Sequence, residues 1–188
     1  MIVTLSGITG VGKSYFKKCI IQDLKFKNMA IVTTREKRKK EIEGIDKYFV
    51  TQEQFEQLKN KEDILVDFEF LGNQYAYRKE DLFFEGNSVT ELHYDTIDEF
   101  KKVNNHVLSI YIIPKDINLA KQELCKRKLT KEAEKLRIQE IEQQLNEFLN
   151  DRKLQKQFDY VVYNDYTDRT KQEILAIVQK MMKGDSYA

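Results

Sequence analysis

Apolar positions along the chain follow two patterns, short contiguous or alternating runs and longer stripes with helical spacing. The short runs predict strands, and they cover residues 2–5, 30–34, 64–71, 74–78, 88–92, 107–113 and 159–164. Apolar residues three or four apart predict helices, and these segments cover about 13–24, 52–61, 97–103, 118–128, 130–156 and a closing helix that ends near 182. Since strands and helices alternate, we expect a parallel sheet wrapped by helices on both faces.

One part of the chain, residues 35–91, departs from this alternation. Gly72-Asn73 is a turn signal between two strand patterns, which predicts an antiparallel hairpin. The helix before the hairpin begins with a capping box, Thr51 with Gln54. We therefore expect an α+β insert in the parallel fold. Three tyrosines of the insert either line a pocket or are half-buried strand residues: Tyr48, Tyr75 and Tyr77.

The segment 130–156 is a long, very polar helix whose apolar stripe is narrow. A helix of this kind packs only lightly on the body of a protein, which suits a mobile lid, although a plain solvated arm fits the same pattern. The expected organisation is a single domain with three parts: a core (1–34, 92–115 and 158–188), the insert (35–91) and a helical lid (116–157).

Composition restricts the class of protein. Lys and Arg number 32 against 31 Asp and Glu, so no excess of positive charge points to nucleic acid or a membrane surface. Cys19 falls on an apolar helix face and Cys125 among lysines, and two such cysteines indicate neither a disulfide framework nor a metal site. No apolar run approaches the ~18 residues of a membrane span, and a strand from Ile2 leaves no room for a signal peptide. We expect a cytoplasmic monomer or homodimer.

The candidate chemistry begins in the first loop, Gly7-Ile8-Thr9-Gly10-Val11-Gly12-Lys13-Ser14. A strand, a glycine-rich turn, Gly-Lys-Ser and a helix start are the context of a P-loop. Glycines let backbone N–H groups wrap a phosphate, and the helix start adds unpaired N–H groups and the positive end of its dipole. Lys13 then reaches the β- and γ-phosphates and Ser14 ligates Mg²⁺, so we expect ATP and Mg²⁺ as cofactors.

A basic run, 35–40, follows the strand pattern at 30–34. Arg35 and Arg38 at the carboxyl end of a strand can hold a phosphate bidentately. A solvated loop fits the same residues equally well, and position alone leaves the two interpretations even.

Taken together, these motifs resemble the guanylate kinase family over nearly the whole chain. The first loop is similar to that family's Gly-Pro-Ser-Gly-Val-Gly-Lys-Ser, and Thr33-Thr34-Arg35-Glu36-Lys37-Arg38 to its Thr-Thr-Arg-x-x-Arg clamp. Further similarities lie at 41–50 (Glu-Val-Asp-Gly-Val-Asp-Tyr-x-Phe-Val in the family), at 72–75 (Gly-Asn-Tyr-Tyr) and in the last strand, 159–165, with its Asn-Asp pair. The resemblance favours the phosphate clamp over the solvated loop.

The resemblance implies transfer of the γ-phosphoryl group of MgATP to GMP or dGMP. It assigns the loop and Asn164 to ATP, Ser14 to Mg²⁺, and Lys13, Arg35 and Arg38 to catalysis, with the lid arginines Arg127 and Arg137 placed by position; Lys126 and Arg152 compete for that lid role. The substrate side would comprise eight residues: Arg35, Arg38, Lys47, Tyr48, Glu69, Tyr75, Glu91 and His93.

The positions that would read the base depart from the family. A serine of the second strand becomes Ile31, and an acceptor-pocket tyrosine falls on Lys47, with Tyr48 one residue later. A base-reading glutamate falls on Val66, with Asp67 and Glu69 nearby, and a carboxylate becomes His93. His93 at a strand end also has a purely structural interpretation. Two alternatives to a guanylate kinase therefore stay open: a kinase of the same fold with another phosphorylated acceptor, and a non-catalytic interaction module of this family.

Overall fold

The computed structural model describes residues 1–126 and 129–184. Its centre is a five-stranded sheet in the order β2-β7-β1-β8-β9, in which every neighbouring pair is parallel. The strands are β1 (Ile2–Gly7), β2 (Lys27–Asn28), β7 (Ser88–Glu91), β8 (Val107–Pro114) and β9 (Tyr160–Asn164). β8 is buried along its whole length, as a strand covered on both faces must be. The parallel α/β core predicted from the alternating pattern is confirmed.

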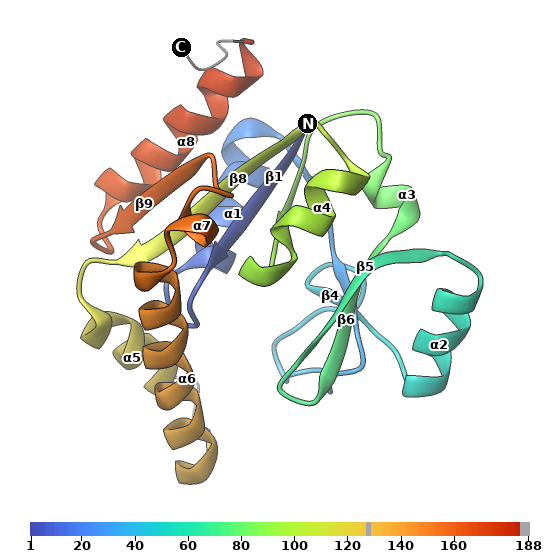
Figure 1. Cartoon of the computed structure of the whole chain (residues 1–188), viewed down its shortest axis with the longest axis horizontal. Coiled ribbons are helices and arrows are strands. Elements are labelled where there is room, and N and C mark those ends of the chain that lie inside the picture. The colour runs from blue at the N-terminus through green and yellow to red at the C-terminus, as the bar shows by residue number, and fades with distance from the viewer. Residues whose placement is uncertain (127–128, 185–188) are drawn as a thin grey trace.

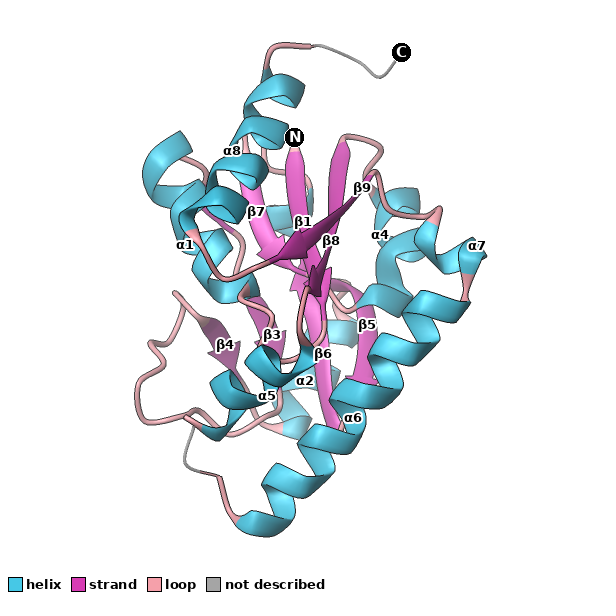
Figure 2. Ribbon diagram, turned by 90° about the vertical axis from the view of Figure 1, so that its left-hand side faces the viewer, coloured by secondary structure: helices cyan, strands magenta, loops and turns pink. Residues whose placement is uncertain are grey.

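Two apolar clusters fill the two faces of this sheet, and β8 contributes alternate residues to each. Ile110 and Ile112 join the cluster under the helices α1 and α8, whereas Tyr111 and Ile113 join the cluster under α4. Figure 2 shows α1 and α8 on one side of the sheet and α4 on the other. The helices are α1 (Lys13–Leu24), α4 (Ile97–Val103), α5 (Ile117–Cys125) and α8 (Asp168–Met182), with a 3₁₀ turn (Tyr94–Thr96) before α4.

The insert is a second sheet of four strands in the order β4-β3-β6-β5, and it lies apart from the parallel sheet in Figure 1. Its strands are β3 (Ile31–Thr33), β4 (Lys47–Phe49), β5 (Ile64–Phe70) and β6 (Asn73–Arg78), with the helices α2 (Gln52–Asn60) and α3 (Lys79–Leu82). The structure shows the expected hairpin between β5 and β6 and the Thr51–Gln54 capping box of α2.

The boundaries between core and insert differ from the expected ones. Residues 31–33 pair with β4 and β6 in the insert sheet, whereas residues 88–91 pair with β1 in the parallel sheet. The core instead uses the two-residue β2, which the sequence did not suggest. All three residues of β3 are buried, and a buried apolar run does not indicate which sheet it joins.

The long polar helix is interrupted. α6 (Lys131–Asn150) ends at Asp151, whose carboxylate accepts hydrogen bonds from the backbone N–H groups of Lys153 and Leu154 and so begins a new helix, α7 (Arg152–Gln155). Ile141 and Phe148 of α6 are fully buried and join the clusters on the two faces of the sheet. α6 is therefore anchored to the body along its second half, and the solvated-arm interpretation is wrong.

Two smaller predictions from the sequence are wrong: that Thr96 with Glu99 caps the helix that follows, and that Met182 lies on the core face of the closing helix. The hydroxyl of Thr96 donates to the carbonyl of His93 at 2.8 Å and does not cap α4, since a 3₁₀ turn precedes that helix. Met182 is 46% exposed because the apolar stripe of α8 has turned away from the sheet by that residue. Within the described ranges, no helix combines the length and the apolar character needed to cross a membrane.

Candidate active site

The loop between β1 and α1 lines a cavity of about 740 Å³ at the carboxyl ends of the parallel strands. Gly10 has a φ of +85°, and a Cβ atom there would lie 2.3 Å from the carbonyl oxygen of Ala120. Gly12, with a φ of +93°, is the N-cap of α1, so the loop enters the helix through a left-handed residue. The first turn of α1 thus leaves its unpaired N–H groups at the edge of the cavity.

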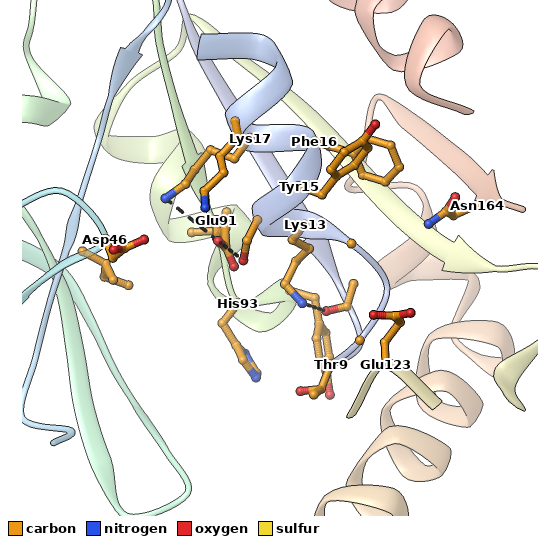
Figure 3. Close-up of a pocket in the computed structure, with 18 of the residues that line it drawn as sticks. Thr9, Lys13, Tyr15, Phe16, Lys17, Asp46, Glu91, His93, Glu123 and Asn164 are labelled. Carbon is orange, nitrogen blue, oxygen red and sulfur yellow. Dashed lines mark hydrogen bonds and ion pairs between the residues drawn. The ribbon is translucent and has the colours of Figure 1, made fainter. Parts of the chain in front are cut away.

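The loop residues divide between the cavity and the core beneath it. Gly7, Thr9, Gly10, Gly12, Lys13 and Ser14 line the cavity, whereas Ile8 and Val11 are fully buried in the core. Nζ of Lys13 donates to the carbonyls of Gly7 at 2.6 Å and Ile8 at 2.9 Å, so its ammonium lies over the loop (Figure 3). At this position the ammonium group would offset the negative charge of a phosphate bound by the loop.

Two side chains, one at the end of β9 and one just after it, hold the loop in place. Asn164, only 2% exposed, donates through Nδ2 to the carbonyl of Val11 at 3.0 Å, and its Oδ1 accepts the backbone N–H of Tyr166 at 2.7 Å. The hydroxyl of Tyr166 donates to the carbonyl of Gly10 at 3.2 Å, and burial raises the pKa of this tyrosine to about 12. Asn164 lines the cavity, but its amide groups bind the protein itself, so the structure gives it a role in positioning the loop.

Glu91, the last residue of β7, lies directly behind Ser14. Its Oε1 accepts a hydrogen bond from the Ser14 hydroxyl at 2.8 Å and lies 3.9 Å from Nζ of Lys17. Burial alone would raise the pKa of Glu91, but Lys17, Lys47 and Lys13 and the Ser14 hydrogen bond lower it to about 2. Glu91 is therefore ionised at neutral pH, and it stands beside the loop, where Figure 3 shows it among the lysines.

The two arginines of the basic run both face the cavity, and both meet Glu41. Arg35 donates from one guanidinium nitrogen to both carboxylate oxygens of Glu41, at 2.7 and 2.9 Å, and Nη1 of Arg38 lies 3.9 Å from the same carboxylate. Burial would raise the pKa of Glu41, but the hydrogen bonds from Arg35 and the backbone of Arg38 lower it. A carboxylate here holds the two guanidinium groups side by side, which is the arrangement a phosphate would need.

Two neighbouring residues of β4 point in opposite directions. Lys47 lines the cavity with its Nζ 5.8 Å from the centroid of the Tyr75 ring, and burial lowers its pKa although Glu91 acts in the opposite sense. Tyr48 faces the other side of the sheet, where the guanidinium of Arg78 lies 4.1 Å from its ring centroid. The expectation that Tyr48 lines the substrate site is therefore wrong, because successive side chains of a strand alternate between faces.

A β-bulge in the hairpin decides which side chains of β5 face the cavity. Register shifts by one residue between Leu65 and Phe68, and Val66 within the bulge has a φ of +54°. Beyond the bulge, Phe68 and Phe70 line the cavity, whereas Glu69 is exposed to solvent on the opposite face. Glu69 is thus not a substrate contact, and the bulge is the reason, since one extra residue reverses the alternation.

His93 lines the cavity next to these aromatic side chains. Its ring lies 5.4 Å from Phe68, 4.9 Å from Phe70 and 4.7 Å from Tyr94, measured between centroids. Burial, with Lys13 as a second cause, lowers the pKa of His93 to about 4, so the imidazole is neutral at physiological pH. Its Nε2 atom is buried and has no hydrogen-bond partner among the described residues.

Only one of the two expected lid arginines can be placed. Arg137 of α6 lines the cavity, donates to Glu140 at 2.9 Å and lies 5.7 Å from the ring centroid of Phe70, so it spans from the lid to the insert. Arg127 falls outside the described residues. Of the competing side chains, Lys126 pairs with Glu123, and Arg152 belongs to α7, away from the residues that line the cavity.

Several cavity residues were not anticipated from the sequence: Lys17, Phe68, Phe70, Tyr94 and Tyr166. Lys17 did carry a signal, because it lies four residues after Lys13 and therefore on the same face of α1. The phenylalanines carried none, since the bulge that turns them inward has no glycine to mark it.

A phosphate-binding loop and a pair of arginines that face one cavity define the molecule as a phosphotransferase of the P-loop kind. The chain belongs to the guanylate kinase family: the family model for guanylate kinase matches residues 1–182. Family and fold together indicate a nucleoside monophosphate kinase.

Solved structures agree with this fold. The guanylate kinase from Anaplasma phagocytophilum is 24% identical, with a TM-score of 0.72 over 96% of this chain and 85% of that one. The shikimate kinase from Bacteroides thetaiotaomicron is more distant, with 12% identity and a TM-score of 0.53 over 97% and 98% of the two chains. An uncharacterized protein from Eubacterium ventriosum is similarly distant, with 12% identity and a TM-score of 0.52 over 96% and 98%.

Proposed function

We propose that this chain transfers the γ-phosphoryl group of ATP to the phosphate of a nucleoside monophosphate. The observation that carries the proposal is that Lys13 of the loop and Arg35 and Arg38 of the insert line the same cavity. Phosphoryl transfer passes through a loose transition state, so catalysis consists of holding the two phosphates in line and neutralising charge on the equatorial oxygens. The loop would hold the donor and the arginines the acceptor, with Lys47 and Tyr75 beside them.

The donor side also suits Mg²⁺. The Ser14 hydroxyl and the ionised Glu91 carboxylate lie 2.8 Å apart, and hard oxygen ligands of this kind are those that Mg²⁺ prefers. Ser14 would ligate the ion directly, and Glu91 would orient that hydroxyl and the surrounding water. When bound, the ion would offset the charge of the β- and γ-phosphates. Arg137 of α6 lines the same cavity beside Phe70, and the lid that carries it would help exclude water.

The family makes GMP or dGMP the first acceptor to test. One observation favours a second candidate, a nucleoside monophosphate with another base: the cavity near the hairpin is lined by Phe68 and Phe70, and the nearby carboxylates Asp67 and Glu69 point away from it. A coupled assay of ADP release with ATP, Mg²⁺ and each common nucleoside monophosphate tests the function. Turnover with at least one of them is expected.

A non-catalytic interaction module is the remaining alternative. A module that only binds a partner protein does not require Lys13 and Ser14 of the loop or the arginine pair of the insert, and this chain has all of them. If no nucleoside monophosphate or sugar phosphate is phosphorylated while the protein is folded, the proposal of a kinase is wrong and the module is favoured.

A further inference from the structure

Phe68 and Phe70 of the hairpin line one end of the cavity, here called the base end. Among the described residues, the hairpin directs no carboxylate into this end that could accept hydrogen bonds from a ligand. Asp67 faces outwards and accepts a hydrogen bond from Lys59 at 2.6 Å, and Glu69 is exposed on the same face. Val66, at the position where the resemblance places a base-reading glutamate, is buried in the apolar cluster.

Three of the carboxylates that line the cavity are already engaged. Glu41 is bound by Arg35, and Glu91 accepts from Ser14. Asp46 accepts the backbone N–H of Ile42 at 2.8 Å within its own loop. The others, Glu123 of α5 and Asp168 of α8, come from helices outside the insert.

The wall of the cavity beside the hairpin is largely aromatic. Phe68 and Tyr75 stack with their ring centroids 5.2 Å apart and an interplanar angle of 13°, and Phe70, His93 and Tyr94 continue this surface. A planar base can stack against such walls whatever its hydrogen-bonding edge is. Discrimination between bases therefore falls to the few polar atoms at this end of the cavity.

One of these polar atoms is Nε2 of His93. The imidazole is neutral, and its Nδ1 lies 3.6 Å from a carboxylate oxygen of Asp95, which favours the proton on Nδ1. Nε2 then carries a lone pair, and it is buried with no donor among the described residues. A buried acceptor without a partner is costly, and a ligand N–H group would satisfy it. The guanidinium of Arg137, next to Phe70, supplies N–H donors for a carbonyl oxygen.

The hydrogen-bonding edges of the bases can be compared with this pair of groups. Adenine and cytosine present a ring nitrogen lone pair, which would face the lone pair of His93. Guanine presents a ring N–H and a carbonyl, but its 2-amino group needs a second strong acceptor, and no carboxylate among the described residues of the hairpin faces the cavity to supply one. Uracil and thymine present one ring N–H beside carbonyl oxygens and no amino group, so one acceptor and one donor satisfy them.

We propose that the acceptor is an oxo-pyrimidine nucleoside monophosphate, with a uracil or thymine base stacked among Phe68, Phe70 and Tyr75 and its N3–H group donated to Nε2 of His93. This inference rests on the proposed function, because it names the acceptor of that reaction. His93 is the residue that determines base specificity.

The test measures kcat/KM for UMP, dUMP, dTMP, CMP, AMP, GMP and IMP with saturating MgATP. We expect UMP, dUMP or dTMP to exceed GMP, CMP and AMP at least tenfold, which is the effect of leaving one buried polar group without a partner. UMP, dUMP and dTMP separate the contributions of the sugar and the methyl group. IMP lacks only the amino group of GMP and should exceed it. GMP, CMP or AMP as the preferred acceptor would overturn the inference.

A paired variant tests the residues themselves. Val66→Glu combined with His93→Asp supplies two carboxylates at the base end, and it should raise kcat/KM for GMP relative to dTMP by at least tenfold. Glu69→Gln, on the outer face of the same hairpin, is the matched control and should leave the ranking unchanged. If the double variant loses its circular dichroism signal, His93→Asn alone replaces it, with a reduced preference for the oxo-pyrimidines expected. An unchanged ranking in a folded variant contradicts the role of His93.

Calorimetric titration separates the two proposals. Affinities of dTMP, UMP, CMP and GMP are measured with a non-hydrolysable ATP analogue present. If no acceptor is phosphorylated but dTMP or UMP binds more tightly than GMP and CMP, the kinase proposal fails and the base inference stands. If GMP is phosphorylated and binds best, the kinase proposal stands and the base inference fails.

Discussion

The half of the site that would hold the phosphate donor and the half that would hold the acceptor differ in whether backbone or side-chain atoms form them. The donor half is backbone: a loop shaped by Gly10 and Gly12, with Asn164 and Tyr166 bonded to its carbonyls. The acceptor half is made of side chains carried by a separate sheet, and the side chain of Arg38 is 48% exposed. Backbone N–H groups are supplied by every residue type except proline, so the first half depends on a few glycines and one lysine. The chemical groups of the acceptor half change with each side-chain substitution, and it is in this half that the chain departs from the family pattern.

Among the variants considered, Lys13→Ala should reduce activity most, and it tests the donor half. Without the ammonium, no point charge lies over the loop to neutralise the transferred group, and kcat should fall by about 10³-fold, the upper range for removal of one preorganised charge partner. Because Lys13 lies over the loop and outside the apolar core, thermal unfolding should shift little. Steady-state kinetics and a melting curve check both, with the exposed Lys180→Ala as control. Full activity in the Lys13 variant would refute the site.

The acceptor half is tested by Arg38→Ala. Its guanidinium lines the cavity but lies outside the buried core, so KM for the acceptor should rise roughly 10- to 100-fold, the effect of one charge-assisted contact of about 1.5–3 kcal/mol. KM for ATP should change far less. The matched control is Lys37→Ala, a neighbouring cation that does not line the cavity. Equal effects on the two Michaelis constants would argue against an acceptor clamp.

Glu91 lies where the two halves meet, and its protonation should change the free energy of unfolding. The pKa of Glu91 is lowered to about 2 from its ordinary value near 4.5, so its ionised form stabilises the folded state above that ordinary value. This contribution is lost as pH falls from about 4.5 towards 2. Relative to Glu91→Gln, the wild type should lose on the order of 2 kcal/mol across this window. Urea unfolding at pH 7 and pH 3 measures the difference, and parallel curves for the two proteins would contradict it.

His93 gives a smaller effect with its own pH window. Its pKa is lowered to about 4, so below pH 6.5 the unfolded chain binds a proton that the folded chain does not. Stability should therefore fall as pH drops from 6.5 to 4, by roughly 1–2 kcal/mol more than in His93→Gln. Proton NMR of the imidazole, assigned with that variant, should give a midpoint near pH 4. A midpoint at 6.5 or above would show that the ring is not buried.

The smallest expected effect is that of Tyr48→Phe. Its ring packs against Arg78 on the face of the insert away from the cavity, and its hydroxyl makes no hydrogen bond within the described ranges of the chain. Both Michaelis constants and kcat should stay within about twofold of the wild type, and stability within about 0.5 kcal/mol. A tenfold rise in KM for the acceptor would place Tyr48 in the site after all.

Local pattern was enough for much of this protein. The conformation of the loop from Gly7 to Ser14 can be predicted from its own residues, because glycine is favoured where the backbone is left-handed and Gly-Lys-Ser marks the helix start. The hairpin, the capping box at Thr51 and the fully apolar β8 are likewise short-range features. Each depends on residues that are neighbours in the chain, and such information can be read from a window of ten residues.

Other features required contacts between distant segments. The assignment of β3 to the insert sheet and the hydrogen bond of Asn164 to Val11 depend on a partner far along the chain. The inward turn of Phe68 and Phe70 depends instead on a bulge that no glycine marks. The alternation of residues predicts which side chains of a strand face inwards only while the strand is regular, and one bulged residue reverses the prediction for every residue after it. The sequence by itself therefore determined the phosphate-binding loop and the class of fold. Tertiary structure alone decided which side chains line the acceptor end, because no residue pattern marks the bulge that sets which side chains of β5 face the cavity.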